Sequence, residues 1–161
     1  AFEMTTFGNF AFWFGFITFV LLFILVSIRH VKFTQIPDPA KPLICIYTAP
    51  LSLCIAGYIQ SVTPKSLNFV IAMLIVATAI YVFALIQAIK CLKFAFYPSF
   101  ASFTFPFVIS AIATKQTMAF AAKQEVVLPL IKYLVIFETV VAVAFVVYTF
   151  IGFMKFIFVK K

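Results

Sequence analysis

Side chains that carry charge or bind metal are scarce in this sequence. Its 161 residues include four acidic residues, one histidine and three cysteines, and charged residues make up only 10% of the chain. Because Cys45, Cys54 and Cys91 have no metal-ligand spacing and only one histidine could join them, we expect no metal site and no cofactor. There is neither a glycine-rich phosphate loop nor a nucleophile–base set, so we predict that the protein is not an enzyme.

Long apolar runs separate the few charges. Hydrophobic residues make up 66% of the sequence, more than a soluble domain of this size can bury. Several uncharged runs exceed the roughly 20 residues that a helix needs to cross a bilayer, and they are continuous, whereas barrel strands alternate. We therefore predict an all-α fold, a polytopic transmembrane helical bundle that forms one domain over residues 1–161. The five predicted spans are 7–28, 43–60, 67–89, 98–119 and 130–153.

Basic residues flank the apolar runs, which is typical of membrane topology signals. The formal net charge of +8 therefore does not indicate a nucleic-acid partner. If the first span runs from outside to inside, most basic residues fall on one side of the membrane. We therefore predict a multi-pass protein of the cell membrane, inner or plasma, with a cytoplasmic C-terminus. The basic residues on that side are Arg29, Lys32, Lys41, Lys90, Lys93, Lys155, Lys160 and Lys161.

A short pattern occurs in both the second and the fourth predicted spans. Residues 47–50 read Tyr-Thr-Ala-Pro and residues 103–106 read Phe-Thr-Phe-Pro, and apolar residues follow each copy. Spans two apart cross in the same direction, so the pattern predicts parallel hairpins related by rotation about the membrane normal. Pro50 and Pro106 are expected to kink their helices and to free backbone carbonyls that must face protein or water. A chance match and kinks without a role in transport are the alternatives.

Small and hydroxyl residues are concentrated in the fourth predicted span. They favour a pore wall dotted with polar groups and narrowed by aromatic rings, and close helix packing is the alternative. The residues that we expect to line a pore or to form its kinks are Tyr47, Pro50, Cys54, Ser102, Phe103, Thr104, Pro106, Ile109 and Ile112.

Residues 97–107, which read YPSFASFTFPF, and residues 111–114, which read AIAT, carry a resemblance to a known family. They are similar to the ninth helix of the tellurite-resistance/dicarboxylate transporter family. That family includes the bacterial tellurite-resistance channel homologue, yeast malate permease and the slow-type anion channels of plant guard cells. Residues 43–50 similarly resemble its seventh helix. The resemblance covers nearly the whole chain, as the last five of ten helices.

This resemblance implies a particular architecture. It implies helical hairpins around a central pore, proline-kinked inner helices, and a homotrimer in which each subunit has its own pore. It also implies that the phenylalanine before the mid-helix proline, here Phe105, plugs the pore, with Phe103 as the competitor if the register is shifted. Only two of five expected pore-lining helices are present. The resemblance thus implies a missing N-terminal half, either on a separate chain or absent because this chain is a fragment.

The expected function follows from this resemblance. The leading expectation is a membrane channel for small inorganic anions such as chloride or nitrate, with a pore closed by Phe105. The alternatives are a proton-coupled carrier for C4-dicarboxylates, a tellurite-resistance exporter of the same family, and a non-conducting membrane subunit. Glu138 is the ionisable residue well inside a span, which counts as functional by default. It either turns toward the surface or bonds to a neighbouring helix, or else it is a proton site.

Overall fold

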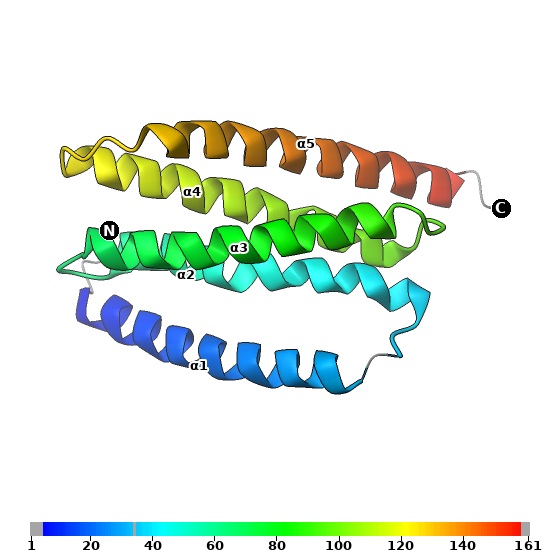
Figure 1. The fold of residues 1–161 in the computed structure, drawn as a ribbon, viewed down its shortest axis with the longest axis horizontal. Coiled ribbons are helices and arrows are strands. Elements are labelled where there is room, and N and C mark those ends of the chain that lie inside the picture. The colour runs from blue at the N-terminus through cyan, green and yellow to red at the C-terminus, as the bar shows by residue number, and fades with distance from the viewer. Residues whose placement is uncertain (1–4, 34, 159–161) are drawn as a thin grey trace.

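The computed structural model describes residues 5–33 and 35–158, which form a helical bundle (Figure 1). Within these residues there are five α-helices, two 3₁₀-helices and no strand, so the predicted all-α fold class is confirmed. Lys160 and Lys161, which the predicted topology includes, lie outside the described residues. The elements in chain order are α1 (Thr5–Lys32), η1 (Asp38–Tyr47), α2 (Thr48–Ser61), α3 (Leu67–Cys91), η2 (Pro98–Phe103), α4 (Phe105–Lys123) and α5 (Pro129–Phe158).

Four segments of the described chain are long and apolar enough to cross a membrane, which is consistent with a membrane protein. They are Thr6–Lys32, Asp38–Ser61, Leu67–Cys91 and Pro129–Phe158. The predicted fourth span, 98–119, is not among them. It divides into η2 and the 19-residue helix α4, where Lys115 and Gln116 lower the hydropathy of the apolar run. The second predicted span, 43–60, lies within the candidate span Asp38–Ser61 and changes from 3₁₀-helix to α-helix after Tyr47. The fourth predicted span changes in the same way around Thr104.

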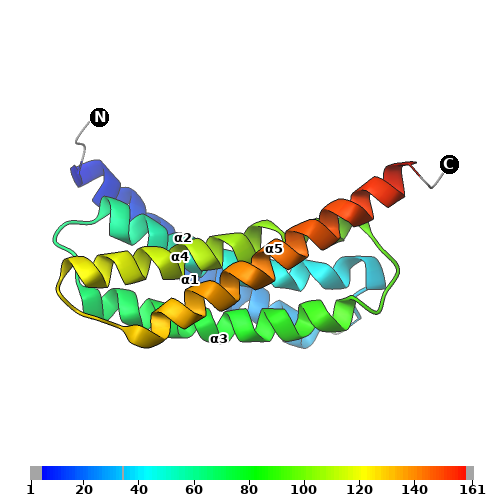
Figure 2. The same cartoon turned by 90° about the horizontal axis from the view of Figure 1, so that it is seen from above.

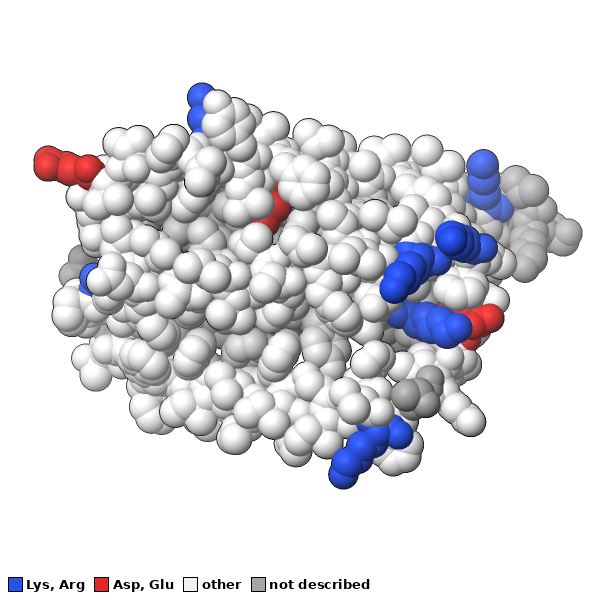
Figure 3. Space-filling model, in the orientation of Figure 1, with Lys and Arg blue, Asp and Glu red and all other residues white. Residues whose placement is uncertain are grey.

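Consecutive α-helices run antiparallel along one long axis (Figure 1). As a result α2 and α4 run in the same direction and pack against each other, and α5 crosses the bundle obliquely (Figure 2). Helix α1 packs mainly on α2 and leaves most of its surface exposed. Most of the visible Lys and Arg residues gather toward one end of the long axis, and an almost uncharged belt separates the two ends (Figure 3).

Aromatic rings form much of the core around η2. Phe103 is fully buried, and its ring centroid lies 4.9 Å from that of Phe100 and 5.2 Å from that of Phe145 on α5. Phe107 lies 4.8 Å from Phe145 and 5.3 Å from Tyr81 on α3. Offset and edge-to-face contacts of this kind stabilise packing beyond the area that they bury. They fix η2 against α5, and they fix the first turn of α4, which contains Phe107, against α3 and α5.

Candidate functional site

The repeated sequence pattern corresponds to a repeated change of helix type. In the first copy η1 ends at Tyr47 and α2 begins at the next residue. In the second copy η2 ends at Phe103, and Thr104 is the N-cap of α4. Each junction lies within a unit of one 3₁₀-helix and two α-helices. The first unit is η1, α2 and α3, and the second unit is η2, α4 and α5. The two units are therefore alike in element order, and they share the aromatic-Thr-x-Pro pattern at the same junction.

The prolines do not kink the middle of an α-helix, which corrects the sequence-based prediction. Pro50 and Pro106 lie in the first turn of α2 and α4, after the chain has left the preceding 3₁₀-helix. The first backbone N–H groups of a helix have no partner within it, so proline removes little there. The carbonyl of Ile46, four residues before Pro50, accepts a hydrogen bond from the Thr48 N–H. The prolines therefore mark where α-helix begins.

Hydroxyl groups join the two units along a buried seam. Ser110 Oγ on α4 lies 2.9 Å from Thr48 Oγ1 and 3.1 Å from Ser52 Oγ, both on α2. Eight residues before Ser110, Ser102 Oγ of η2 donates to the Pro42 carbonyl of η1 at 2.6 Å. All of these side chains are buried. We call Thr48, Ser52, Ser102 and Ser110 the hydroxyl seam, and its hydroxyls join one unit to the other.

Four predicted pore residues from the second unit have separate surroundings. Ser102 belongs to the hydroxyl seam, and the Thr104 hydroxyl donates to the nearby Ala101 carbonyl at 2.8 Å. Phe103 is fully buried among aromatic rings, and Ile109 is 9% exposed. These four side chains pack against this chain's own helices. The prediction that they line a pore is not supported by any cavity described here.

The other predicted residues lie on two different sides of the hydroxyl seam. Tyr47 and Pro50 line an apolar groove of about 570 Å³ between α1 and the η1–α2 segment, and Cys54 is half-buried nearby on α2. Ile112 is 41% exposed and lines a groove of about 350 Å³ between α4 and α5. Phe105, the predicted gate, is 53% exposed and lines neither groove. The described residues thus do not bring these side chains together around one conduit.

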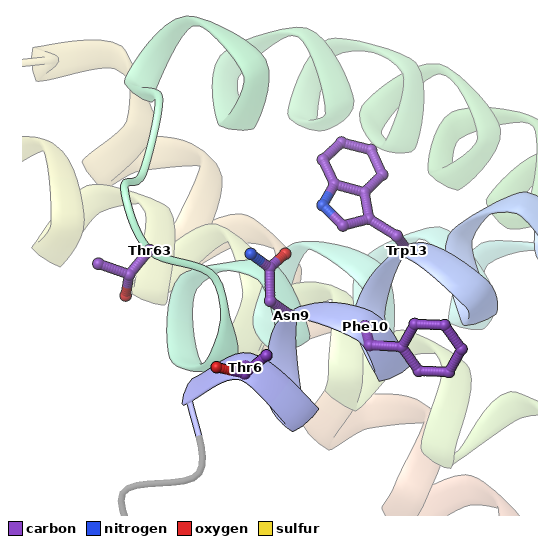
Figure 4. Close-up of a pocket in the computed structure, with 5 residues that line it drawn as sticks. All are labelled: Thr6, Asn9, Phe10, Trp13 and Thr63. Atoms are coloured by element: carbon purple, nitrogen blue, oxygen red, sulfur yellow. The ribbon is translucent and has the colours of Figure 1, made fainter.

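A more polar pocket of about 480 Å³ lies where α1 begins, beside the α2–α3 connection. Asn9 lies between Thr63 and Trp13 in this pocket (Figure 4). None of its lining residues is a predicted site residue, and none is titratable. Among the described residues no three His, Cys, Asp or Glu side chains lie together as metal ligands.

Glu138 does not turn toward the surface. The residue is 1% exposed, and it lines a narrow crevice between α2, α3, α4 and α5. Its buried face of α5 continues through Ala142 and Phe145 to Thr149. The spacing of these residues, four, three and four positions, is that of one helix face. Sequence reasoning missed the crevice because the hydroxyls that share it come from other helices.

Comparison with known proteins adds no identification. No family model, no curated protein and no solved structure matches the chain. A function therefore has to be inferred from the residues and their geometry.

Proposed function

We propose that this chain is a multi-pass protein of the cell membrane that forms half of a conduit for small anions. The observation that carries the proposal is the way in which the two units pack. The α2 face that bears Ala49, Ser52 and Ala56 is buried, and Ser52 contacts Ser110 on a different face of α4. A contact between two different faces of equivalent helices is a head-to-tail contact. Further units can be added through the same contact until the units close into a ring.

The second unit leaves the equivalent face open. The sequence repeat aligns Ala49 and Ala56, which are buried, with Phe105 and Ile112, which are 53% and 41% exposed. A further unit on this side would cover the face around Ile112, and the proposal requires that Phe105, the more exposed of the two residues, stays at the inner edge of the ring. This arrangement supports the proposal that an N-terminal half, which the family resemblance implies, completes the conduit around Phe105. The homotrimer rests on that resemblance alone.

Charge at one end of the bundle favours anions over cations. The C-terminal ends of α1 and α3 and the start of η1 lie at the same end (Figure 1), and five of the ten Lys and Arg residues in the described part of the chain lie at or next to them. A cluster of one sign raises the local concentration of the opposite ion, by an amount that falls with salt. On the positive-inside rule, we propose that this end faces the cytoplasm. The basic residues concerned are Arg29, Lys32, Lys41, Lys90 and Lys93.

The experiment that tests this function is the anion current of Phe105→Ala in the assembled pore. Removing the ring opens the conduit, so we expect a clear rise in chloride current over the unsubstituted protein. Phe150→Ala is the matched control, because Phe150 on α5 is similarly exposed, at 62%, and lies far along the chain from the open face of α4. A folded Phe105→Ala protein that conducts no better than the control contradicts the gate.

A proton-coupled carrier for C4-dicarboxylates, or a tellurite-resistance exporter, is the second candidate, and buried Glu138 is the observation that favours it. Such a carrier shows saturable flux that follows a pH gradient and is lost in Glu138→Gln. A non-conducting subunit, by contrast, predicts that Phe105→Ala changes no transport at all.

A further inference from the structure

The crevice that contains Glu138 is built from four helices and is lined by oxygen atoms. Ser52 of α2, Thr78 of α3, Ser110 and Thr114 of α4, and Glu138 of α5 all face it. The remaining lining is apolar, and the free space is too small to hold a water molecule. A polar cavity of this kind normally contains ordered water that satisfies its groups. Here the side chains must satisfy one another.

Each hydroxyl that lines the crevice has an acceptor on its own helix, four residues back. Thr78 Oγ1 donates to the Leu74 carbonyl at 2.8 Å, and Thr114 Oγ1 donates to the Ser110 carbonyl at 3.1 Å. The Ser52 and Ser110 hydroxyls are placed in the same way toward the carbonyls of Thr48 and Pro106. A hydroxyl has only one proton to donate. Thr78 and Thr114, whose protons go to these carbonyls, therefore present oxygen lone pairs to the crevice, whereas Ser52 and Ser110 also share a hydrogen bond with each other.

Glu138 adds a carboxyl group to this set of acceptors and has no positive partner there. One of its oxygens, Oε2, is buried without a hydrogen-bond partner. Tyr81 of α3 is the titratable group that interacts with it electrostatically, and the Tyr81 hydroxyl is likewise buried and unpartnered. No titratable group of α2 lines the crevice, and Lys115 of α4 and Lys132 of α5 are exposed. An ionised carboxylate in this place would be a buried charge without compensation, which is strongly unfavourable.

The contact between Glu138 and Thr114 indicates how the carboxyl group is satisfied. The two side chains lie within hydrogen-bonding reach of each other in the crevice. The single Thr114 proton is directed to the Ser110 carbonyl, so an ionised carboxylate could receive it only if that bond broke. A protonated carboxyl group can donate to the Thr114 oxygen and leave the bond to Ser110 intact.

We propose that this crevice is a proton-binding site, in which Glu138 holds one proton and donates it to Thr114. Binding adds one proton from the solvent to a Glu138 carboxylate oxygen and removes one negative charge from the interior. Release leaves a carboxylate among oxygen lone pairs, which repel it, and so loosens α5 from α3 and α4. The site goes beyond the proposed anion conduit, because it exists whether or not the assembled protein conducts.

Infrared spectroscopy of the purified chain in lipid vesicles tests the proposal directly. At neutral pH and without sodium, we expect a carbonyl stretching band from a protonated carboxyl group, and we expect Glu138→Gln to remove it. Glu125→Gln is the matched control and should leave the band intact, since Glu125 lies exposed after α4. A neutral-pH spectrum without this band, or a band that persists in Glu138→Gln, overturns the proposal.

A second variant keeps the test decisive if Glu138→Gln does not fold. Thr114→Val has nearly the same shape but no oxygen that can accept a hydrogen bond from the carboxyl group. Because the carboxyl group then loses this hydrogen bond, its carbonyl stretching band should move to higher wavenumber in the folded variant. An unmoved band would show that Thr114 is not the acceptor. The same spectrum is also recorded in buffer that contains sodium. If the band appears only when sodium is removed, sodium occupies the crevice at neutral pH, and the proposal of a proton site is overturned.

Discussion

Ser110→Ala tests whether the hydroxyl seam holds the two units together. Ser110 is 3% exposed, and its Oγ contacts two hydroxyls of α2. The substitution removes both interhelical contacts, and it leaves the Thr48 hydroxyl buried without that partner. Two contacts at about 0.6 kcal/mol each, and about 1 kcal/mol for the stranded hydroxyl, predict a loss of about 2 kcal/mol in the free energy of unfolding.

The assay is reversible unfolding of the purified chain in mixed detergent micelles, followed by helix content. Ser99→Ala makes the same chemical change at a hydroxyl that is buried but has no hydrogen-bond partner. It should therefore shift the unfolding free energy by no more than about 0.5 kcal/mol. If Ser110→Ala and Ser99→Ala have equal stability, the seam does not stabilise the packing of the two units, and the reasoning is refuted.

Two further substitutions test other parts of the fold by the same unfolding measurement. Phe103→Ala, which removes a fully buried ring from the aromatic core, should cost about 3 kcal/mol, whereas Phe105→Ala at a half-exposed position should cost less than about 1 kcal/mol; equal costs would contradict the placement of the two rings. Gly152→Ala puts a Cβ into the Phe96 ring and should cost about 1–3 kcal/mol, whereas Gly15→Ala meets open space and should not destabilise the fold; an unchanged Gly152→Ala protein would contradict this close approach.

The existence of the helices could be predicted from the apolar runs, but the type of helix at the two junctions could not. Pro50 and Pro106 were expected to interrupt α-helices, because an internal proline removes a hydrogen bond. In the structure, each α-helix instead begins within one turn of its proline, and the preceding residues form the 3₁₀-helices η1 and η2. That choice depends on packing between η1 and η2, including the hydrogen bond from Ser102 to Pro42, which no local pattern reveals.

The sequence likewise does not reveal which neighbours surround the buried polar side chains. Thr48, Ser52, Ser110 and Thr114 are spaced four apart within their helices, which is a visible sequence signal, yet the spacing does not say which helices face each other. The α2–α4 pairing decides it and turns these hydroxyls inward. Glu138 could be singled out as an ionisable residue within a span, but its burial follows from the contacts of α5 with α4.

The central claim is that Phe105 closes an anion conduit in the assembled protein. Its most direct measurement is the single-channel current, in planar bilayers with chloride on both sides, of assembled proteins carrying Phe105→Ala or Phe150→Ala. The account predicts resolved chloride openings for Phe105→Ala that are absent, or much smaller, for Phe150→Ala. Equal currents from the two folded variants, or no current from either, would contradict it.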